Sequence, residues 1–318
     1  MKEIAIGVDI GGTFTKFGLV DREGNVLAES SMATYKHSSP ESFIKVLFTE
    51  LEILRQPFQG QIKLMGIGIG APNANAHKGT IEHAPNLNWK GVVPFKELLA
   101  NYFPSTEISL TNDANAAALG EMVFGAAKGK SDFMVVTLGT GLGSGIVSNG
   151  KLLIGHDGFA GELGHVTVVP NGRQCNCGRM GCLETYVSAP GIRRTLMELI
   201  ADTTYESPLR DISFIKLSAK DITEQANHGD KLALAAFSKT GEILGAALAN
   251  AVAFTSPEVI YLFGGLAKSG DLILEPTRKN FEENLLNIYR GKTRIELSGI
   301  QDRSAAILGA SSLVWANE

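Results

Sequence analysis

The stretch Asp9-Ile10-Gly11-Gly12-Thr13-Phe14-Thr15-Lys16 joins two apolar runs near the start of this 318-residue chain. Residues 4–9 and 14–20 are typical of buried strands, so the two glycines between them predict a tight hairpin turn. Backbone amides at such a turn can converge on an anion, and the threonine hydroxyls can add donors. Asp9, at a strand end, can hold a metal ion through water. Taken alone, a plain hairpin also explains the stretch.

The same chemistry returns in the second half, at Leu138-Gly139-Thr140-Gly141-Leu142-Gly143-Ser144-Gly145. A predicted strand at 133–138 runs into this glycine-rich turn, and the chain returns as a strand at 144–147. Two such turns at matching places favour a nucleotide phosphate site over two unrelated hairpins. They predict a duplicated α/β unit with a ligand crevice between its halves and a boundary near 115–130.

The remaining elements are predicted from hydrophobic periodicity and turn residues. Pro40 opens a helix whose apolar stripe is Phe43, Ile44, Leu47, Phe48, Leu51 and Leu54. Further strands are predicted at 26–30, 64–69, 108–110, 259–263 and 294–297. Further helices are predicted at 94–102, 112–121, 183–200, 218–227, 230–254 and 304–315.

Two other phosphate motifs fail on inspection. Gly129-Lys130-Ser131 resembles the tail of a P-loop, but Phe124 stands where the first glycine is required. Gly66-x-Gly68-x-x-Ala71 resembles a dinucleotide fingerprint, but Pro72 follows where the helix should continue.

All three cysteines of the chain, Cys175, Cys177 and Cys182, lie close together, and His165 precedes them by ten residues. Three thiols and an imidazole form a complete tetrahedral zinc set, and nearby glycines allow the backbone to fold around an ion. An odd number of cysteines argues against a disulfide framework, although a redox pair with a leftover thiol remains an alternative. Four protein ligands leave no open coordination position, so we expect a structural zinc.

Three acidic residues are candidates for the chemistry. Glu162 and Glu184 flank the cysteine loop, where they either form a rigid polar pocket or are ordinary surface acids. Asn112-Asp113 ends a strand and begins a helix. A carboxylate there can accept the proton of an attacking hydroxyl during phosphoryl transfer, and the alternative is a simple helix N-cap.

Composition narrows the class of protein. At 33.9 kDa the chain is long enough for one large or two medium domains. The net charge is −4, so the chain lacks the excess of lysine and arginine that is typical of nucleic-acid-binding proteins. We therefore expect no nucleic-acid partner. The amino terminus lacks the features of a signal peptide, and no apolar run approaches the ~20 residues of a membrane span. We therefore expect a cytoplasmic protein without a membrane partner.

Taken in order along the chain, these motifs resemble the ROK family (repressors, open reading frames, kinases), which includes zinc-containing bacterial sugar kinases. The two glycine turns resemble its phosphate motifs, and Gly264-Gly265 after a strand resembles its adenosine-side motif. The most specific part of the resemblance is Gly161-Glu162-x-Gly-His165 followed by Cys175-x-Cys177-Gly-x-x-Gly-Cys182-Leu-Glu184.

The resemblance implies an actin-like ATPase (ribonuclease H-like) fold, with two α/β domains around a central cleft and a structural zinc loop. The first domain is expected at 1–114 plus 303–318, because the final helix returns to it, and the second at 115–302. The family also implies a homodimer.

The resemblance further implies ATP-dependent phosphorylation of a hexose 6-hydroxyl, with Mg²⁺ as the partner of ATP. By position, Asp113 is the base that deprotonates the hydroxyl. It is also a sugar contact, together with Asn112, Glu162, His165 and Glu184. His165 would serve twice, with one ring nitrogen on zinc and the other toward the sugar. The nucleotide contacts are expected to be Asp9, Gly11, Gly12, Thr13, Thr15, Lys16, Gly139, Thr140, Gly141, Gly264 and Gly265.

The segment Ala84-Pro85-Asn86-Leu87-Asn88-Trp89-Lys90-Gly91 resembles the sugar-proximal loop of family glucokinases, which favours glucose. Kinases of N-acetylmannosamine or N-acetylglucosamine remain alternatives, and so does a non-catalytic sugar-binding regulator. One departure is Pro72-Asn73, where family glucokinases usually read Pro-Gly. We expect no room for the helix-turn-helix that repressors carry ahead of their first strand.

Overall fold

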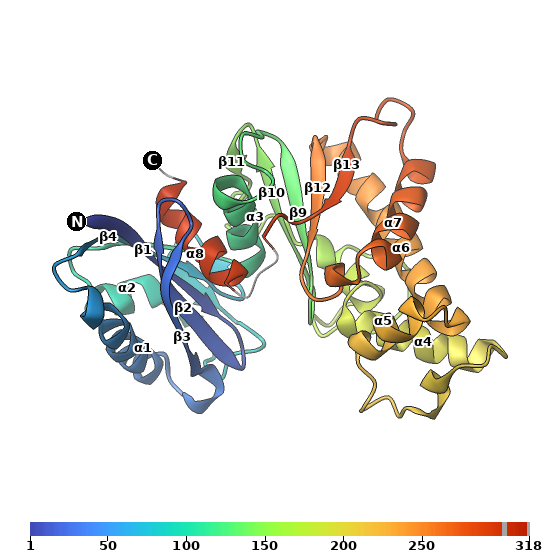
Figure 1. Ribbon diagram of the computed structural model, residues 1–318, viewed down its shortest axis with the longest axis horizontal. Coiled ribbons are helices and arrows are strands. Elements are labelled where there is room, and N and C mark those ends of the chain that lie inside the picture. Colours follow the sequence, from blue (N-terminus) through green and yellow to red (C-terminus); the bar gives the residue numbers. More distant parts are fainter. Residues whose placement is uncertain (301–303, 317–318) are drawn as a thin grey trace. The chain divides into compact units, whose positions relative to one another are not determined.

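Each half of the chain folds around its own five-stranded sheet (Figure 1). The computed structural model describes residues 1–300 and 304–316. Its first compact unit comprises Met1–Lys130, Lys151–Gly161 and Gly299–Glu318. Its second comprises Ser131–Gly150 and Glu162–Ser298. The first unit extends beyond the expected end at residue 114, because the helix that begins there packs on the final helix of the chain.

The first sheet combines an antiparallel hairpin with parallel strands in the order β3-β2-β1-β4-β8. Strands β1, β2 and β3 pair antiparallel, whereas β4 runs parallel to both β1 and β8. Parallel strands are covered on both faces, which explains the continuous apolar runs along the chain. The strands are β1 (Lys2–Ile10), β2 (Phe14–Asp21), β3 (Val26–Ala33), β4 (Ile62–Gly70) and β8 (Glu107–Thr111).

The second sheet repeats this arrangement in the order β11-β10-β9-β12-β13. Strands β9 and β10 form an antiparallel hairpin, and β12 runs parallel to both β9 and β13. The predicted duplication of an α/β unit is therefore confirmed. The strands are β9 (Phe133–Leu138), β10 (Leu142–Ser148), β11 (Lys151–Leu152), β12 (Val259–Phe263) and β13 (Arg294–Leu297).

The final helix, α8 (Ala305–Trp315), packs on β1, β4 and α3 of the first unit. Its backbone comes so close to the sheet that a Cβ at Gly7 would overlap the carbonyl oxygen of Ile307. A Cβ at Gly68 would likewise overlap the carbonyl oxygen of Ala310. Glycine is therefore required at both positions. This helix, expected from the family resemblance to return to the first domain, lies in the first compact unit.

The other elements of the first unit lie beside this sheet. The aromatic rings of Phe43, Trp89 and Phe95 pack together, with Phe43 and Trp89 4.7 Å apart between centroids. The helices are α1 (Pro40–Arg55), α2 (Phe95–Ala100) and α3 (Asp113–Phe124), and a small sheet contains β5 (Ala74–Asn75), β6 (Thr80–Glu82) and β7 (Val92–Val93).

Three α-helices of the second unit were predicted from the sequence, and a fourth, α7, was not. Helix α7 contains Pro276. A proline inside a helix usually ends it, so the sequence gives no clear signal for a helix here. Here the ring packs against Gly241 of α6. The helix predicted at 183–200 begins later, because Ser188 caps it and Pro190 follows. The helices are α4 (Ala189–Asp202), α5 (Ala219–Asn227), α6 (Lys231–Thr255) and α7 (Asp271–Asn284).

Helix α6 is long and apolar enough to cross a membrane by length and composition alone, which the sequence analysis did not anticipate. However, 61% of its most apolar stretch is buried. Leu244, Leu248 and Val252 are fully buried in the core of the second unit. Its composition is therefore accounted for by a core helix of this unit.

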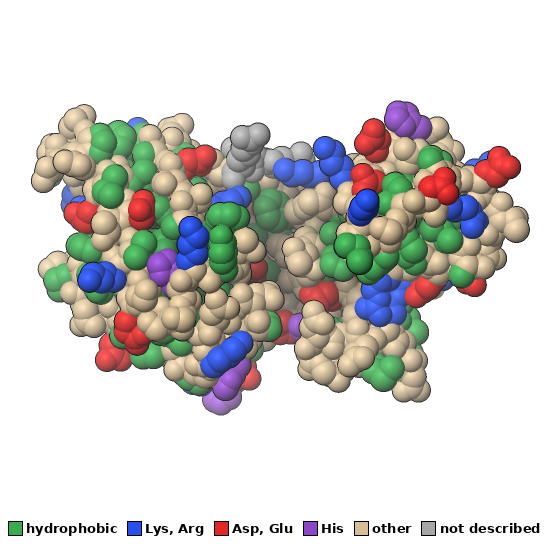
Figure 2. All heavy atoms as spheres, turned by 90° about the horizontal axis from the view of Figure 1, so that it is seen from below, with side chains coloured by type: hydrophobic (Ala, Val, Ile, Leu, Met, Phe, Trp, Pro, Cys, Tyr) green, Lys and Arg blue, Asp and Glu red, His purple; other side chains and the backbone are tan. Residues whose placement is uncertain are grey.

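Charged side chains of both signs are intermixed on the face drawn in Figure 2. The sequence has 29 lysines and arginines against 33 aspartates and glutamates, which agrees with this near balance. A mixed surface keeps the protein well hydrated without a strong field of one sign.

A single buried carboxylate holds the first and the last of the segments that connect the two units. Glu121 of α3 is only 1% exposed. Its Oε2 accepts hydrogen bonds from the amides of Ala126 (2.8 Å) and Gly299 (3.3 Å), and its Oε1 from Ile300 (3.2 Å). The chain first leaves this unit after Lys130 and returns to it for the last time at Gly299. Glu121 therefore ties the outgoing segment to the returning one.

We expect Glu121→Ala to lower the free energy of unfolding by about 3 kcal/mol, because three backbone amides, one of them in a buried hydrogen bond, lose their acceptor. Chemical denaturation followed by circular dichroism measures this loss. Glu97→Ala, at an exposed position of α2, is the matched control and should stay within about 0.5 kcal/mol of wild type. An equally small effect for Glu121→Ala would contradict the anchoring role.

Candidate active site and metal centre

The first group of candidate residues lies where the parallel strands of the first sheet end. Asp9 pairs with Gly70 in the register of β1 and β4, and Gly70 pairs with Thr111 of β8. Asp113 follows two residues later. A Cβ built on Gly70 would lie 3.7 Å from the Cα of Asp113 and 3.9 Å from Oδ1 of Asp9. The fold therefore brings the two predicted acids together at the carboxyl edge of the sheet, the usual place for a ligand site in such sheets.

Their surroundings change the acidity of both carboxyls. Burial, followed by repulsion from Asp113, raises the pKa of Asp9 to about 6, although Lys16 on the facing strand opposes the shift. Burial also raises the pKa of Asp113, against the backbone amide of Ala114, which stabilises its charged form. A carboxylate with a raised pKa is a stronger base, so Asp113 is suited to accepting a proton.

Helix α3 fixes the positions of Asn112 and Asp113. Asn112 is its N-cap, and Oδ1 of Asn112 accepts a hydrogen bond from the amide of Asn115 at 2.7 Å. The carboxylate of Asp113 accepts one from the amide of Ala114 at 2.9 Å. The capping alternative is thus correct for Asn112, while Asp113 sits in the first turn, where a negative charge is favoured.

The first glycine turn has the predicted shape, with the amide of Gly11 donating to the carbonyl of Phe14 at 3.1 Å. Thr13 is exposed, as a ligand contact would be. Thr15 differs from expectation, because it is fully buried and its hydroxyl shares a 2.8 Å hydrogen bond with the hydroxyl of Thr34. Thr15 therefore joins β2 to the segment after β3, and its hydroxyl is already engaged there.

The predicted sugar-proximal loop lies against this turn. A Cβ on Gly12 would lie 2.6 Å from the carbonyl oxygen of Asn86. Trp89 is buried, and its indole nitrogen donates to the carbonyl of His37 at 3.2 Å. The loop at 84–91 is thus anchored by an aromatic side chain and directly contacts the first phosphate motif.

Family glucokinases usually have Pro-Gly where this chain has Pro72-Asn73. The backbone at Asn73 nevertheless adopts a conformation that glycine favours. Asn73 has a φ of 51°, in the left-handed region. Asparagine is one of the few residues that adopt this region readily, so it can replace the glycine that family glucokinases usually have there.

Asn75 is a positioning residue that the sequence analysis missed. It is fully buried, and its Nδ2 donates to the carbonyl of Asp157 at 2.8 Å and to Oε1 of Glu82 at 3.2 Å. Its Oδ1 accepts from the amides of His77 and Lys78. The side chain thus joins the small sheet to the segment that precedes Glu162. A lone asparagine in a two-residue strand carries no sequence signal for such a role.

The second group of candidates lies at the carboxyl ends of β9 and β12. The amide of Gly139 donates to the carbonyl of Gly141 at 2.9 Å, which closes the second glycine turn. Gly264 has a φ of 103°, and a Cβ there would lie 2.7 Å from the carbonyl oxygen of Leu138. Glycine is required for both reasons. The second phosphate motif and the adenosine-side motif therefore adjoin at one edge of the second sheet.

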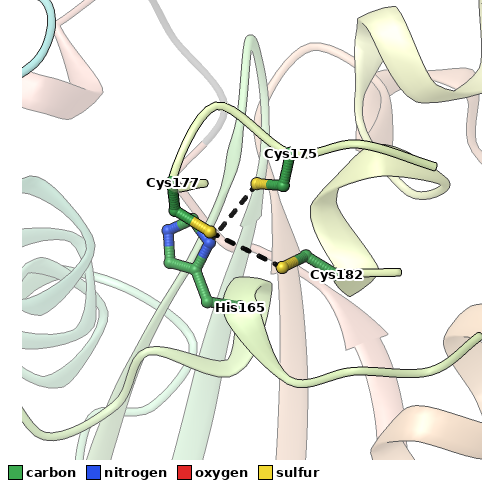
Figure 3. Close-up of side chains that lie close together, drawn as sticks. All are labelled: His165, Cys175, Cys177 and Cys182. Carbon is green, nitrogen blue, oxygen red and sulfur yellow. Dashed lines mark hydrogen bonds between the residues drawn. The ribbon is translucent and has the colours of Figure 1, made fainter. Parts of the chain in front are cut away.

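The predicted metal ligands converge on one point (Figure 3). The ligand atoms of His165, Cys175, Cys177 and Cys182 all lie within 4.8 Å of one another. The sulfurs of Cys177 and Cys182 are 3.7 Å apart, and the sulfur of Cys175 is 3.7 Å from Nδ1 of His165. Zinc–sulfur bonds of about 2.3 Å in a tetrahedron place two sulfurs about 3.8 Å apart, so the spacing fits zinc. It is far too long for a disulfide, which needs about 2.05 Å.

The electrostatics of the cluster also fit a cation. Burial raises the pKa of the Cys175 thiol to about 12 and also raises that of Cys182, whereas at Cys177 burial is outweighed by hydrogen bonds, which lower the pKa. Three neighbouring thiolates are therefore unfavourable unless a divalent cation neutralises them. Zinc bound here would have four protein ligands and would act by holding the loop together.

The loop around the cluster is stabilised by two arginines that the sequence analysis did not single out. Arg179 donates to the carbonyl of His165 at 3.0 Å. Arg173 is buried, lies over the ring of Tyr186 at 4.4 Å, and donates twice to the carboxylate of Glu198. These contacts join the cysteine loop to α4.

The two flanking glutamates lie on different sides of the cluster. Nε2 of His165, the nitrogen not facing the sulfurs, is 3.9 Å from the carboxylate of Glu162. The carboxylate of Glu184 instead lies 3.7 Å from the sulfur of Cys175 and accepts the amide of Leu142 at 3.0 Å. The histidine is thus oriented so that one nitrogen can bind a metal while the other stays outside the cluster.

Comparison with known proteins identifies the family. The profile of the ROK family matches residues 5–317. The chain belongs to the ROK family. It is 35% identical over 319 residues to the glucokinase of Halalkalibacterium halodurans, covering 98% of this chain and 95% of that protein. It is also 30% identical over 311 residues to the xylose repressor of Caldicellulosiruptor bescii, covering 97% of this chain and 77% of the repressor.

A solved structure agrees with this assignment to the ROK family. The ROK family glucokinase from Streptomyces griseus, in complex with glucose and AMPPNP, is 32% identical in sequence and superposes with a TM-score of 0.81. The match covers 98% of each chain. The expected actin-like ATPase fold is therefore confirmed for this member of the family.

We expect one zinc ion per chain, and we expect Cys177→Ser to lose most of it, because the set would be left with three ligands. Elemental analysis measures the metal, and hydrogen exchange measures the stability of 162–184, which should fall with it. Met180→Ser changes an exposed residue of the same loop and should retain the zinc. Freshly purified wild-type protein without zinc would contradict the assignment.

We expect Asp9→Asn to stabilise the protein at pH 7 by roughly 1–3 kcal/mol. The folded pKa of about 6 lies above the unfolded value of 3.8, so stability falls as pH rises between these values and stays lower above them. Asparagine removes this cost, and its advantage should disappear below about pH 4.

Asp21→Asn is the control of opposite sign. Burial of Asp21 acts to raise its pKa, but hydrogen bonds from Lys2 and Asn25 outweigh burial and lower it. Its charged form therefore stabilises the fold, and the substitution should destabilise the protein at pH 7. Thermal unfolding between pH 4 and 8, without added magnesium, tests both variants, and a loss of stability in Asp9→Asn would refute the argument.

Proposed function

We propose that this protein transfers the γ-phosphoryl group of ATP to the 6-hydroxyl of a hexose, with glucose as the preferred substrate. The observation that carries the proposal is the pairing of Asp113 and Asp9 at the carboxyl edge of the first sheet, within a fold shared with glucokinases. A base with a raised pKa and a phosphate-binding turn are the two parts that such a transfer requires.

In the proposed reaction, the sugar oxygen forms a bond to the γ-phosphorus while the bond from that phosphorus to the bridging oxygen of ATP breaks. The carboxylate of Asp113 accepts the proton of the attacking hydroxyl, and ADP leaves. The turn around Gly11 and Gly12 would bind phosphate oxygens through its amides, and Lys16 would supply a positive charge. Mg²⁺ bound with ATP would neutralise phosphate charge, held by Asp9 through water.

We expect five residues to bind the sugar. Asn112 and Asp113 would contact it from the start of α3, and Glu162, His165 and Glu184 from around the metal centre. Support comes from His165, whose Nε2 lies outside the sulfur cluster and can hydrogen-bond a hydroxyl while zinc fixes the ring. Gly139, Thr140 and Gly141 would bind phosphate, and Gly264 and Gly265 would adjoin the adenosine.

The resemblance of the loop at 84–91 to that of family glucokinases, together with the similarity of the chain to glucokinases, supports glucose over its alternatives. Trp89 fixes this loop against the aromatic cluster, and the loop meets the first phosphate turn at Asn86. Kinases of N-acetylmannosamine or N-acetylglucosamine remain the alternatives within the same chemistry. The similarity to a xylose repressor keeps a sugar-binding regulator as a second candidate, although a regulator has no need of a base. We further propose a cytoplasmic homodimer.

The decisive experiment is a coupled assay of ADP formation with ATP and a panel of hexoses. We expect turnover with glucose and, in Asp113→Asn, a loss of about 10²–10⁴-fold in kcat, because only the transition state requires the base. Glucose binding, measured by calorimetry, should change little in this variant.

Absence of turnover with every sugar, despite sugar binding, would favour the regulator. Preferred turnover of an N-acetylated hexosamine would favour the alternative kinases. A variant that keeps more than about a tenth of wild-type kcat would show that Asp113 is not the base.

A further inference from the structure

One side chain lies between the metal centre and the second glycine turn. Glu184 belongs to the short 3₁₀ helix Leu183–Thr185, directly after the metal ligand Cys182. Its Oε1 lies 3.7 Å from the sulfur of Cys175, and its Oε2 accepts the amide of Leu142 at 3.0 Å. The two oxygens of one carboxylate thus contact two motifs that lie more than thirty residues apart in sequence.

The turn is fitted closely around this carboxylate. A Cβ built on Gly141 would overlap Oε2 of Glu184, and, its two chain neighbours apart, the carboxyl carbon of Glu184 is the only other atom of the described residues within 4 Å. Gly141 has no positive φ, so an alanine there meets no backbone strain. The space taken by Glu184 is therefore the reason that this position favours glycine.

A second contact joins the same two segments. The amide of Ala189 donates to the carbonyl of Gly139 at 2.9 Å, at the other end of the turn. The carbonyl of Glu184 in turn accepts the hydroxyl of Ser188 at 2.7 Å, which fixes the chain between the two contacts. The glycine turn is consequently held at both ends by residues 184–189.

A carboxylate in this position does not itself bind phosphate, since two negative groups repel. It also occupies the amide of Leu142, which is then not available to a phosphate. Its effect is to fix the backbone of the turn before the nucleotide arrives, which lowers the conformational cost of binding.

We propose that Glu184 is a positioning residue for the nucleotide: it holds the second glycine turn in its phosphate-binding shape and connects it to the metal centre. The inference rests on the proposed function and adds to it, because Glu184 is otherwise expected only as a sugar contact. The two roles differ in one measurable respect. A sugar contact does not affect nucleotide affinity when sugar is absent, whereas a positioning residue does.

The test is calorimetric titration of AMPPNP with Mg²⁺ into zinc-loaded protein without sugar. We expect Glu184→Ala to weaken AMPPNP binding about tenfold to a hundredfold, because a charged hydrogen bond to the turn is lost. Glu184→Gln keeps an oxygen acceptor of the same reach and should stay within about threefold of wild type. Glu162→Ala, on the other side of the metal centre, should weaken glucose binding and leave AMPPNP binding unchanged.

A double-mutant cycle gives an independent measurement and does not depend on one variant. Gly141→Ala should weaken AMPPNP binding in the wild-type background, because its methyl group meets Glu184. In the Glu184→Ala background it should add little further loss, so the two effects are expected to be strongly non-additive. Zinc content and thermal unfolding are measured for each variant, so that loss of the metal centre is distinguished from loss of positioning.

Wild-type AMPPNP affinity in folded, zinc-loaded Glu184→Ala would overturn the inference, and so would additive effects in the cycle. Where Glu184→Ala does not fold, Glu184→Gln and Gly141→Ala still decide it. Equal affinities in wild type and Gly141→Ala would then overturn it. Wild-type protein that does not bind AMPPNP at all contradicts the proposed kinase function itself, which is a different result.

Discussion

The second unit depends on the gathering of four metal-binding atoms within 4.8 Å of one another. Burial raises the pKa of two of the three thiols, so a divalent cation would stabilise the thiolate form of this cluster and the fold of this segment. The chain around it contributes His165, Glu162 and Glu184, and Arg173 and Arg179 tie the loop to its surroundings. A metal bound there would fix the side chains that we propose as sugar contacts.

The first unit achieves a comparable result without a metal. There, the parallel strands β1, β4 and β8 end at the same edge of the sheet, and this register brings Asp9 beside Asp113. Burial and mutual repulsion raise the pKa of Asp9 to about 6, which costs folding stability. Such a cost is typical of active sites, where groups are held in environments that favour chemistry over stability. The packing of α8 through Gly7 and Gly68 and the anchoring by Glu121 offset it.

The sequence predicted the structure best where a short motif determines its own backbone conformation. The glycine turns, the metal ligands and the strand before Asp113 were all predicted, because each depends on residues close together in the chain. Prediction failed where a distant contact decides the outcome. Helix α7 tolerates Pro276 because Gly241 of α6 makes room for its ring. Thr15 faces Thr34 rather than the open end of its turn.

The sequence by itself determined the duplicated α/β order, the metal-ligand set and the family. These follow from hydrophobic periodicity, residue chemistry and spacing along the chain. Only the tertiary structure decided that Asp113 lies beside Asp9, that Asn75 is buried against the segment before Glu162, and that Glu184 reaches the second glycine turn. Each of these three contacts joins residues that lie far apart in sequence. Their proximity results from strand register and close packing, which no local pattern records.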